Sequence, residues 1–321
     1  MATFDLVVVG DANPDVLIAG APAVPAYGQA ETLVEAGSLA LGGSAAIVAH
    51  GAARLGLSTA LVSLVGRDAA GDFVLDALSS AGVDISLVAR HEREPTALTV
   101  CLGGADGDRA ILTSLGCLAS FEPPKQLPSS RHVHAAAYFL QPRLAAGLAE
   151  LFGDARSRGR TTSLDTNDDP AGSWKLAPGV LDVCDYLLPN EAEALALTGT
   201  SDVRAAMAAF ADATVTPVVK RGRHGATALN SGKTHTVRST PVDPVDTVGA
   251  GDSFDAGFLA GLLSTGDLDL ALALGCACGA LSTQAAGGTA AQPSWNQAVT
   301  YASATTSTAP VATIAHNEEE S

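Results

Sequence analysis

The chain has 321 residues, of which 47% are hydrophobic and 16% are charged, so it can bury one large core or two modest ones. This composition excludes disorder for most of the chain. Its 34 acidic and 18 basic residues give a net charge of −16, which repels nucleic-acid phosphates and anionic lipid headgroups. We therefore expect no nucleic-acid partner. Any phosphate ligand must be held by backbone N–H groups, a helix N-terminus or a metal ion.

Three further observations bound the location of the protein. The longest weakly polar stretch, residues 270–281, has 12 residues, whereas a membrane-spanning helix needs about 20. The five cysteines are odd in number and form no CxxC motif, which argues against a disulfide framework. The N-terminus lacks the basic region and long apolar segment of a signal peptide. We expect a cytoplasmic protein that does not associate with membranes.

In chain order, short apolar runs alternate with Ala- and Leu-rich segments of helical length, a pattern typical of strands and helices that alternate in a parallel sheet. It predicts an α/β fold in which a doubly wound, mostly parallel sheet is flanked by helices. The expected strands are 6–9, 60–65, 132–136, 162–165, 186–188 and 218–220. The expected helices are 45–55, 69–81, 143–158, 191–198, 203–211 and 250–263.

Two segments and the C-terminus depart from this alternation. Residues 16–41 are extended and contain prolines and glycines, and residues 96–115 are predicted to form two strands around a glycine-rich turn. Together they predict a small β-sheet lid that stands off the main sheet; the alternative is a surface excursion that covers a sheet edge. Residues 303–321 are rich in Ser, Thr and Ala and end in acidic residues, so they are predicted to be a disordered tail.

The most informative window is 241–263, where a loop rich in Pro and Asp leads through Gly249, Ala250 and Gly251 into an apolar helix. The glycines lack a Cβ, so an anion can approach the backbone amides, and the helix dipole favours negative charge there. Asp252 follows directly and could take a proton from a hydroxyl. Phosphoryl transfer needs both parts, whereas the alternative role for Asp252 is helix capping.

Four ordered motifs then resemble one family. The segment DTVGAGDSF at 246–254 resembles the C-terminal signature of the ribokinase-like, or PfkB, carbohydrate kinases, and GGSAAIVAHGAARLG at 42–56 resembles their N-terminal signature. Between them, LPNEAEA at 188–194 resembles the family's Asn-x-x-Glu element, and VVKRGRHGA at 218–226 its nucleotide-binding strand and turn. The resemblance implies a ribokinase-like kinase domain over 1–302. It also implies an ATP- and Mg²⁺-dependent kinase that phosphorylates a hydroxyl of a small sugar.

The resemblance assigns roles to the matching residues. Asp252 is expected to be the general base, and the amides of Gly249, Ala250 and Gly251 are expected to form the anion hole for the γ-phosphate. Asn190 and Glu193 are expected to hold the Mg²⁺–ATP unit, Glu193 through water, whereas their alternative role is a helix cap. Further nucleotide contacts are implied for Lys220, Gly222, Gly225 and Cys276. A K⁺ site is implied for Asp246, Val248, Ser282, Ala285, Gly287 and Ala291.

The acceptor site is expected at the end of the first strand, because open α/β sheets bind ligands at the carboxyl ends of their strands. Asn13 and Asp15 would bind sugar hydroxyls, although an Asx turn is the alternative. The other acceptor candidates are Gly42, Gly43 and Gln141, with Arg143 as a second choice that would suit an acidic acceptor or simply start a surface helix. Ile47 stands where many family members have Asn, which leaves ribose itself in doubt.

Two rival functions stay open at this stage. A nucleoside kinase of the same family is one, but the lid segments offer only Tyr27 for stacking on a base. A non-catalytic sugar- or nucleotide-binding homologue is the other, and the intact Asp252 argues against it. The resemblance also implies that a homodimer can form through the edge of the lid sheet. His132 and His134 lie on one face of a strand without metal-ligand partners at a suitable spacing, so we expect them to be structural.

Overall fold

The computed structural model describes residues 4–104, 108–210 and 214–306. In these residues a nine-stranded sheet runs in the order β13-β12-β11-β10-β9-β8-β1-β4-β5, parallel except for the antiparallel pairs β11–β12 and β12–β13. The strands are β1 (Phe4–Val9), β4 (Thr59–Gly66), β5 (Val88–His91), β8 (Ser130–Ala135), β9 (Thr161–Leu164), β10 (Tyr186–Leu187), β11 (Thr216–Lys220), β12 (Ala226–Asn230) and β13 (Lys233–Val237). The mostly parallel sheet that the sequence predicts is therefore confirmed.

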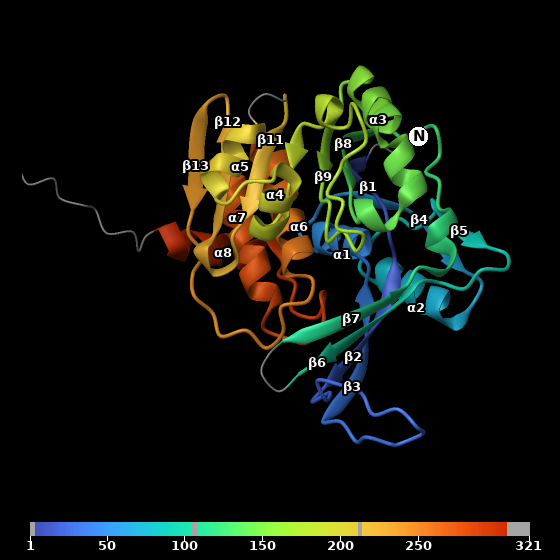
Figure 1. The fold of residues 1–321 in the computed structure, drawn as a ribbon. Helices are drawn as coiled ribbons and strands as arrows, with labels where there is room; N and C mark the ends of the chain where they lie inside the picture. Colours follow the sequence, from blue (N-terminus) through green and yellow to red (C-terminus); the bar gives the residue numbers. More distant parts are fainter. Residues whose placement is uncertain (1–3, 105–107, 211–213, 307–321) are drawn as a thin grey trace, which may run out of the picture.

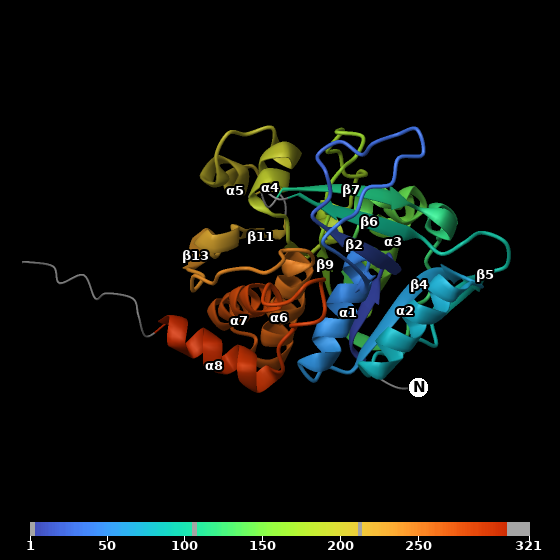
Figure 2. The ribbon, with the colours of Figure 1, turned by 90° about the horizontal axis from the view of Figure 1, so that it is seen from below.

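Helices cover both faces of this sheet (Figure 2). One face carries α1 (Ser44–Arg54), α2 (Ala69–Ser80), α6 (Ala250–Thr265), α7 (Leu268–Ser282) and α8 (Trp295–Thr306). The other carries α3 (Pro142–Ser157), α4 (Glu191–Thr198) and α5 (Val203–Phe210). Successive side chains of β1 serve the two cores in turn, since Leu6 and Val8 pack on the first face and Val7 and Val9 on the second. Both faces are buried, which explains the continuous apolar runs of the strands.

The predicted elements agree with this structure to within a few residues, with two corrections at the C-terminal end. The β12–β13 hairpin extends the sheet beyond the expected strand at 218–220. Helix α8 runs to Thr306 and buries Ala298 and Ala302 in the core, so the prediction of a disordered tail from residue 303 is wrong for 303–306. Its remainder, 307–321, lies outside the described residues. Position 211 of the expected helix 203–211 also lies outside them.

The two irregular segments form a separate sheet, which Figure 1 shows projecting from one end of the large sheet. This small sheet has the order β3-β2-β6-β7 and consists of β2 (Asn13–Ala19), β3 (Ala36–Gly42), β6 (Leu98–Gly103) and β7 (Arg109–Ser114). Strand β2 pairs antiparallel with β3 and parallel with β6. The predicted β-sheet is thus confirmed, and residues 10–12 alone join it to β1.

At β1 the direction in which the chain adds strands to the sheet reverses. Strand β1 lies between β4 and β8: the chain first adds β4 and β5 on one side of β1 and then β8, β9 and the later strands on the other. Ligands of open α/β sheets bind beside such a switch, at the carboxyl ends of the strands. The residues that follow β1, β8, β9 and β11 are therefore the ones to inspect. Within the described helices, none combines the length and apolar character needed to cross a bilayer.

Candidate active site

The N-terminus of α6 forms an open cluster of backbone donors. Gly249 precedes the helix with a φ of 69°, and a Cβ there would lie 2.6 Å from Gly288 Cα, so only glycine fits. Among the described residues, the amides of Gly249 and Gly251 have no hydrogen-bond acceptor, whereas the Ala250 amide has a long bond of 3.3 Å to the Thr247 carbonyl. Two of the three predicted anion-hole amides are therefore available to a ligand at the positive end of the helix dipole.

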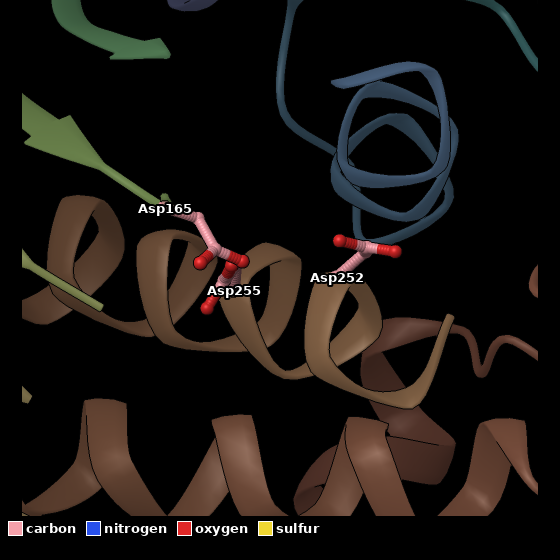
Figure 3. A group of neighbouring side chains, drawn as sticks. All are labelled: Asp165, Asp252 and Asp255. Atoms are coloured by element: carbon pink, nitrogen blue, oxygen red, sulfur yellow. The ribbon is translucent and has the colours of Figure 1, made fainter. Parts of the chain in front are cut away.

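Asp252 lies in the first turn of α6 and is 8% exposed. Figure 3 shows its carboxylate directed toward the N-terminal end of α1, where it hydrogen-bonds the Ser44 side chain. Burial, reinforced by the negative charge of Asp165, raises the pKa of Asp252 to about 7. A carboxylate with a pKa near neutrality beside unpaired amides is equipped to accept a proton from a hydroxyl at physiological pH.

Asp15 lies on β2, and it is 6% exposed. The Asn13 Nδ2 donates to its Oδ1 over 3.0 Å, so the two predicted acceptor residues do lie together. The paired strand β3 ends in Gly42, where a Cβ would lie 1.9 Å from Asp15 Oδ1. At Gly43, which has a φ of 84°, a Cβ would lie 2.9 Å from the Asp11 carbonyl oxygen. The two glycines therefore make room for the acceptor side of the site.

The carboxylate of Asp15 lies close enough to those of Asp11 and Asp252 for their charges to interact. Burial raises the pKa of Asp15 to about 7, and the neighbouring charges of Asp11 and Asp252 act in the same direction. Asp11 was not singled out from the sequence. It follows β1 and caps α1, since Oδ1 accepts from the Ala45 amide over 2.9 Å and Oδ2 from the Ser44 amide over 3.1 Å. Its position directly after a buried strand is the signal that could have identified it.

Asn167 is a second residue that the sequence analysis missed. It follows β9 with a φ of 55°, and its Nδ2 donates to Ser44 Oγ over 2.8 Å. Its Oδ1 accepts from the Ala137 amide at 2.7 Å, which ties the end of β8 to the start of α1. Ser44 therefore receives contacts from three sides, namely Asp11, Asn167 and Asp252.

The structure places Gln141 and Arg143 differently from the acceptor role predicted for them. Gln141 is fully buried, and its Nε2 donates to the carbonyls of Ala136 and Ala137, each over 3.1 Å. These two hydrogen bonds therefore stabilise the turn that leads into α3. Arg143 donates to Glu122 over 2.6 Å on the exposed surface of α3. Neither side chain has a contact with Asp15 or Asp252 in the described part of the chain.

Asn190 and Glu193 form the cap that was the alternative to Mg²⁺ binding. The Asn190 side chain accepts from the Glu193 amide over 2.9 Å, and Glu193 Oε2 accepts from the Asn190 amide over 2.9 Å. This is a complete capping box for α4. Glu193 is nevertheless buried, and burial raises its pKa to about 7. A buried carboxylate of this kind is stabilised by an added cation, so the cap and the predicted Mg²⁺ role are compatible.

The remaining predicted nucleotide residues have mixed positions. Gly222 begins a short turn with a φ of 52°, and a Cβ there would meet open space. Gly225 has a φ of 90°, and its Cβ would lie 1.9 Å from the Val237 carbonyl oxygen, so packing on β13 explains this glycine. Cys276 is buried in α7, and burial raises the pKa of its thiol to about 12.

The two loops of the predicted K⁺ site lie against each other. The Val245 amide donates to the Thr283 carbonyl over 2.8 Å, and the Gly287 amide donates to Asp246 Oδ2 over 2.8 Å. Asp246 also accepts from the Val248 amide and pairs with Arg109 of β7 at 3.5 Å. The structure thus brings the segments 246–248 and 282–291 together, as a shared cation site would require.

Lys220 is directed away from the nucleotide turn. At the end of β11, its Nζ lies 2.7 Å from Asp165 Oδ2 and 3.2 Å from Asp255 Oδ2. Oxygens of Asp165, Asp252 and Asp255 all lie within 4.8 Å of one another, with Asp252 and Asp255 on one face of α6 (Figure 3). The spacing would suit a metal ion, but the Lys220 ammonium already supplies the positive charge. The contact of Lys220 with nucleotide stays a prediction, since in this structure its ammonium is paired with two carboxylates.

His132 and His134 are fully buried on β8, as expected of structural residues. His132 hydrogen-bonds Thr161 and Ser163, and His134 hydrogen-bonds Ser163, each over 2.7 Å. Burial lowers the pKa of His132 to about 3 and that of His134 to about 4. Both rings are neutral at physiological pH and fill the core between β8 and β9.

Comparison with known proteins agrees with this geometry. The family model described as pfkB family carbohydrate kinase matches residues 3–295. An ATP-dependent ribose-1-phosphate kinase of Halopiger xanaduensis is 34% identical, over 75% of this chain and 79% of the relative. A 2-dehydro-3-deoxygluconokinase of Bacillus subtilis is 30% identical, over 83% of this chain and 88% of the relative. The ribokinase structure of Arabidopsis thaliana with ribose and ATP superposes with a TM-score of 0.82 at 25% identity, covering 94% of this chain and 99% of the other.

A doubly wound α/β domain with a small second sheet, an amide cluster at a helix N-terminus and an adjacent buried acid defines a phosphotransferase of the ribokinase fold. The chain belongs to the pfkB family of carbohydrate kinases. Its activity is accordingly that of a sugar or nucleoside kinase.

Proposed function

We propose that the protein transfers the γ-phosphoryl group of ATP to a hydroxyl of a small, uncharged sugar. The observation that carries this proposal is the pairing of the unbonded Gly249 and Gly251 amides with Asp252 at the same helix end. The amides stabilise the negative charge of the transferring group, and Asp252 accepts the proton of the attacking hydroxyl. Because the pKa of Asp252 is about 7, we expect kcat/KM to fall as the pH decreases through neutrality.

Asn190 and Glu193 would hold Mg²⁺ of the nucleotide, Glu193 through a water molecule. When bound, Mg²⁺ neutralises phosphate charge that this acidic protein otherwise repels. A fructokinase of Vibrio cholerae with the same fold was solved with fructose, ADP and a potassium ion. The contact between the segments 246–248 and 282–291 supports a K⁺ site at the equivalent loops here.

The charge of the acceptor side favours an uncharged sugar over a phosphorylated or acidic one. Asp11, Asp15 and Asp252 gather there, and in addition to burial the charge of Asp11 raises the pKa of both Asp15 and Asp252, so an anionic acceptor would meet repulsion. Carboxylates accept hydrogen bonds from sugar hydroxyls. Arg143 would suit an acidic acceptor, but its side chain is paired with Glu122 on the surface. A nucleoside acceptor has little support, because Tyr27 in the small-sheet connection is 92% exposed.

The test is a phosphotransfer assay with ATP and Mg²⁺ against matched acceptors, including ribose, ribose 1-phosphate, fructose, 2-dehydro-3-deoxygluconate and adenosine. We expect turnover with an uncharged sugar, and a loss of about 10²-fold or more in kcat for Asp252→Asn with ATP affinity preserved. Asp267→Asn is the matched control, since Asp267 caps α7 away from the site.

Near-normal kcat for Asp252→Asn would contradict the mechanism. Turnover of ribose 1-phosphate alone would overturn the acceptor class and keep the kinase. If ATP and sugars bind but no acceptor is phosphorylated, the protein is a non-catalytic sensor.

A further inference from the structure

A buried lysine joins three elements beneath the anion hole. Lys220 ends β11, Asp165 follows β9, and Asp255 lies in the second turn of α6. Their exposed fractions are 8%, 1% and 0%, so the cluster is cut off from solvent. The Lys220 Nζ contacts both carboxylates, at 2.7 Å to Asp165 and 3.2 Å to Asp255. The sheet and the helix are therefore connected here by charge rather than by apolar packing alone.

The charge state of the cluster follows from its contacts. Burial raises the pKa of Asp255 well above its ordinary value, and the side chain shares a hydrogen bond with Asp165. Burial also disfavours the charge of Asp165, but the ammonium of Lys220 and the hydrogen bonds from Asp255 and Lys220 together hold the pKa of Asp165 below its ordinary value. The contacts make Lys220 the cation of the cluster, Asp165 its nearest ion-pair partner and Asp255 the second carboxyl group that holds it. A buried ammonium with these partners is compensated, whereas a lone one would be strongly disfavoured.

The Lys220 ammonium lies next to the first turn of α6, which carries Gly251 and Asp252. A Cβ built on Gly251 would be 3.5 Å from Lys220 Nζ, which is van der Waals distance, so the anion-hole residue and the cation are neighbours. Asp252 is three residues before Asp255 on the same face of α6 (Figure 3). The cluster thus sets the position of the turn that carries Gly251 and Asp252.

We propose that Lys220, held by Asp165 and Asp255, is a positioning residue for phosphoryl transfer: it fixes the first turn of α6 at the ends of β9 and β11 and partly offsets the negative charge that Asp165 exerts on Asp252. The proposal rests on the proposed function, because it assigns Lys220 to the same site. It differs from the role expected from the sequence, in which Lys220 contacts the nucleotide. A purely structural ion pair is the alternative, since buried pairs can often be replaced by apolar residues without loss of stability.

The charges of Asp165 and Lys220 have opposite effects on the pKa of Asp252. Asp165 raises the pKa of Asp252, and Lys220 lowers it. The groups that face Asp252 from the surrounding elements are Asp11 after β1, Asp15 on β2, Asp165 after β9, Glu193 on α4, Lys220 on β11 and Asp255 on α6. Removing the lysine should therefore raise the pKa of the base, and neutralising Asp165 should lower it.

The experiment compares Lys220→Met, Asp165→Asn and Lys220→Arg with the wild-type full chain. We expect the acidic limb of kcat/KM to move up by about half a pH unit or more in Lys220→Met and down in Asp165→Asn. Lys220→Arg keeps the charge and should restore the wild-type limb in part. Isothermal titration with ATP gives a readout that does not depend on turnover, and Lys220→Met should bind ATP about tenfold more weakly.

Leu148→Ala is the matched control, because Leu148 is fully buried in the core on the opposite face of the sheet. It should lose stability while keeping its ATP affinity and pH limb. If the lysine variants behave in the same way, the cluster is merely structural and the proposal is overturned. If Lys220→Met does not fold, the nearly isosteric Asp165→Asn decides the question through its pH limb and ATP affinity. Absence of turnover in the wild type would instead refute the proposed function, and the titration would still test the role of Lys220.

Discussion

The large and the small sheet differ in how their strands are covered. In the large sheet, β1 and β4 are buried along nearly their whole length, since helices pack on both faces. In the small sheet, β7 is exposed at all six residues and β3 at its first four. Strand β2 passes from one environment to the other, buried from Asn13 to Asp15 and increasingly exposed toward Ala19. The residues proposed for phosphoryl transfer thus belong to the buried frame, and those proposed for the acceptor lie where the exposed sheet joins it.

This difference separates the expected effects of mutation. Substitutions at the frame should alter the rate of transfer, because they move donors and the base relative to each other. Substitutions on β2 should alter the acceptor KM. Substitutions on the exposed face of the small sheet should alter association between copies and leave the chemistry nearly unchanged.

The largest effect is expected for Gly249→Ala in the frame. The new Cβ would lie 2.6 Å from Gly288 Cα, so the donor turn must shift, and we expect kcat to fall by about 10²-fold. Gly266→Ala is the matched control, because Gly266 has the same left-handed φ of 71° and nothing within 4 Å of its Cβ. It should cost about 1 kcal/mol of unfolding free energy with normal kcat. Equal activity of the two variants would contradict the role of this turn.

An intermediate effect is expected for Asp15→Asn at the junction. We expect the sugar KM to rise about tenfold and the ATP KM to stay within twofold, measured by steady-state kinetics. The variant should also be more stable than the wild type at pH 8. The folded pKa of Asp15 is about 7 and the ordinary value is 3.8, so the folded state binds more protons between these values and loses stability as the pH rises through them.

Thermal unfolding measures this second part. The gain at pH 8 should be on the order of 1–2 kcal/mol and should fade below about pH 3, where the Asp15 carboxyl is protonated in both the folded and the unfolded wild type. A gain of equal size at both pH values would mean that the burial of a carboxylate is not its cause.

The smallest effect on activity is expected on β7. Ile111 and Leu112 are 57% and 59% exposed and alternate on opposite faces of the strand. If the small sheet mediates the predicted homodimer, Ile111→Asp or Leu112→Asp should shift sedimentation toward the monomer, with kcat changed less than threefold. Because the two residues lie on opposite faces, only one of the two substitutions should disturb the interface, and the other serves as its control. Unchanged association in both variants would exclude these faces as the dimer interface.

The sequence predicted the frame better than the contacts within it. The order of strands and helices, the Gly249–Asp252 turn and the proximity of Asn13 and Asp15 follow from local patterns of hydrophobicity, glycine and capping. The Lys220 cluster does not, because it joins residues that lie 55 and 35 positions apart. Asn190 and Glu193 illustrate a second limit, since the same two side chains cap a helix in the absence of any ligand. Local composition also misled at α8, which packs on the core through Ala298 and Ala302 and continues as a helix into the Ser- and Thr-rich segment.

The donors that we propose for the phosphate are peptide N–H groups, and peptide groups are present whatever the side chain. Most point substitutions elsewhere in the gene cannot delete them, and only a change of backbone path can. Asp15 and the exposed strands, by contrast, can vary one side chain at a time. A lineage with this architecture can therefore explore new acceptors by single amino-acid exchanges while it inherits the transfer step intact.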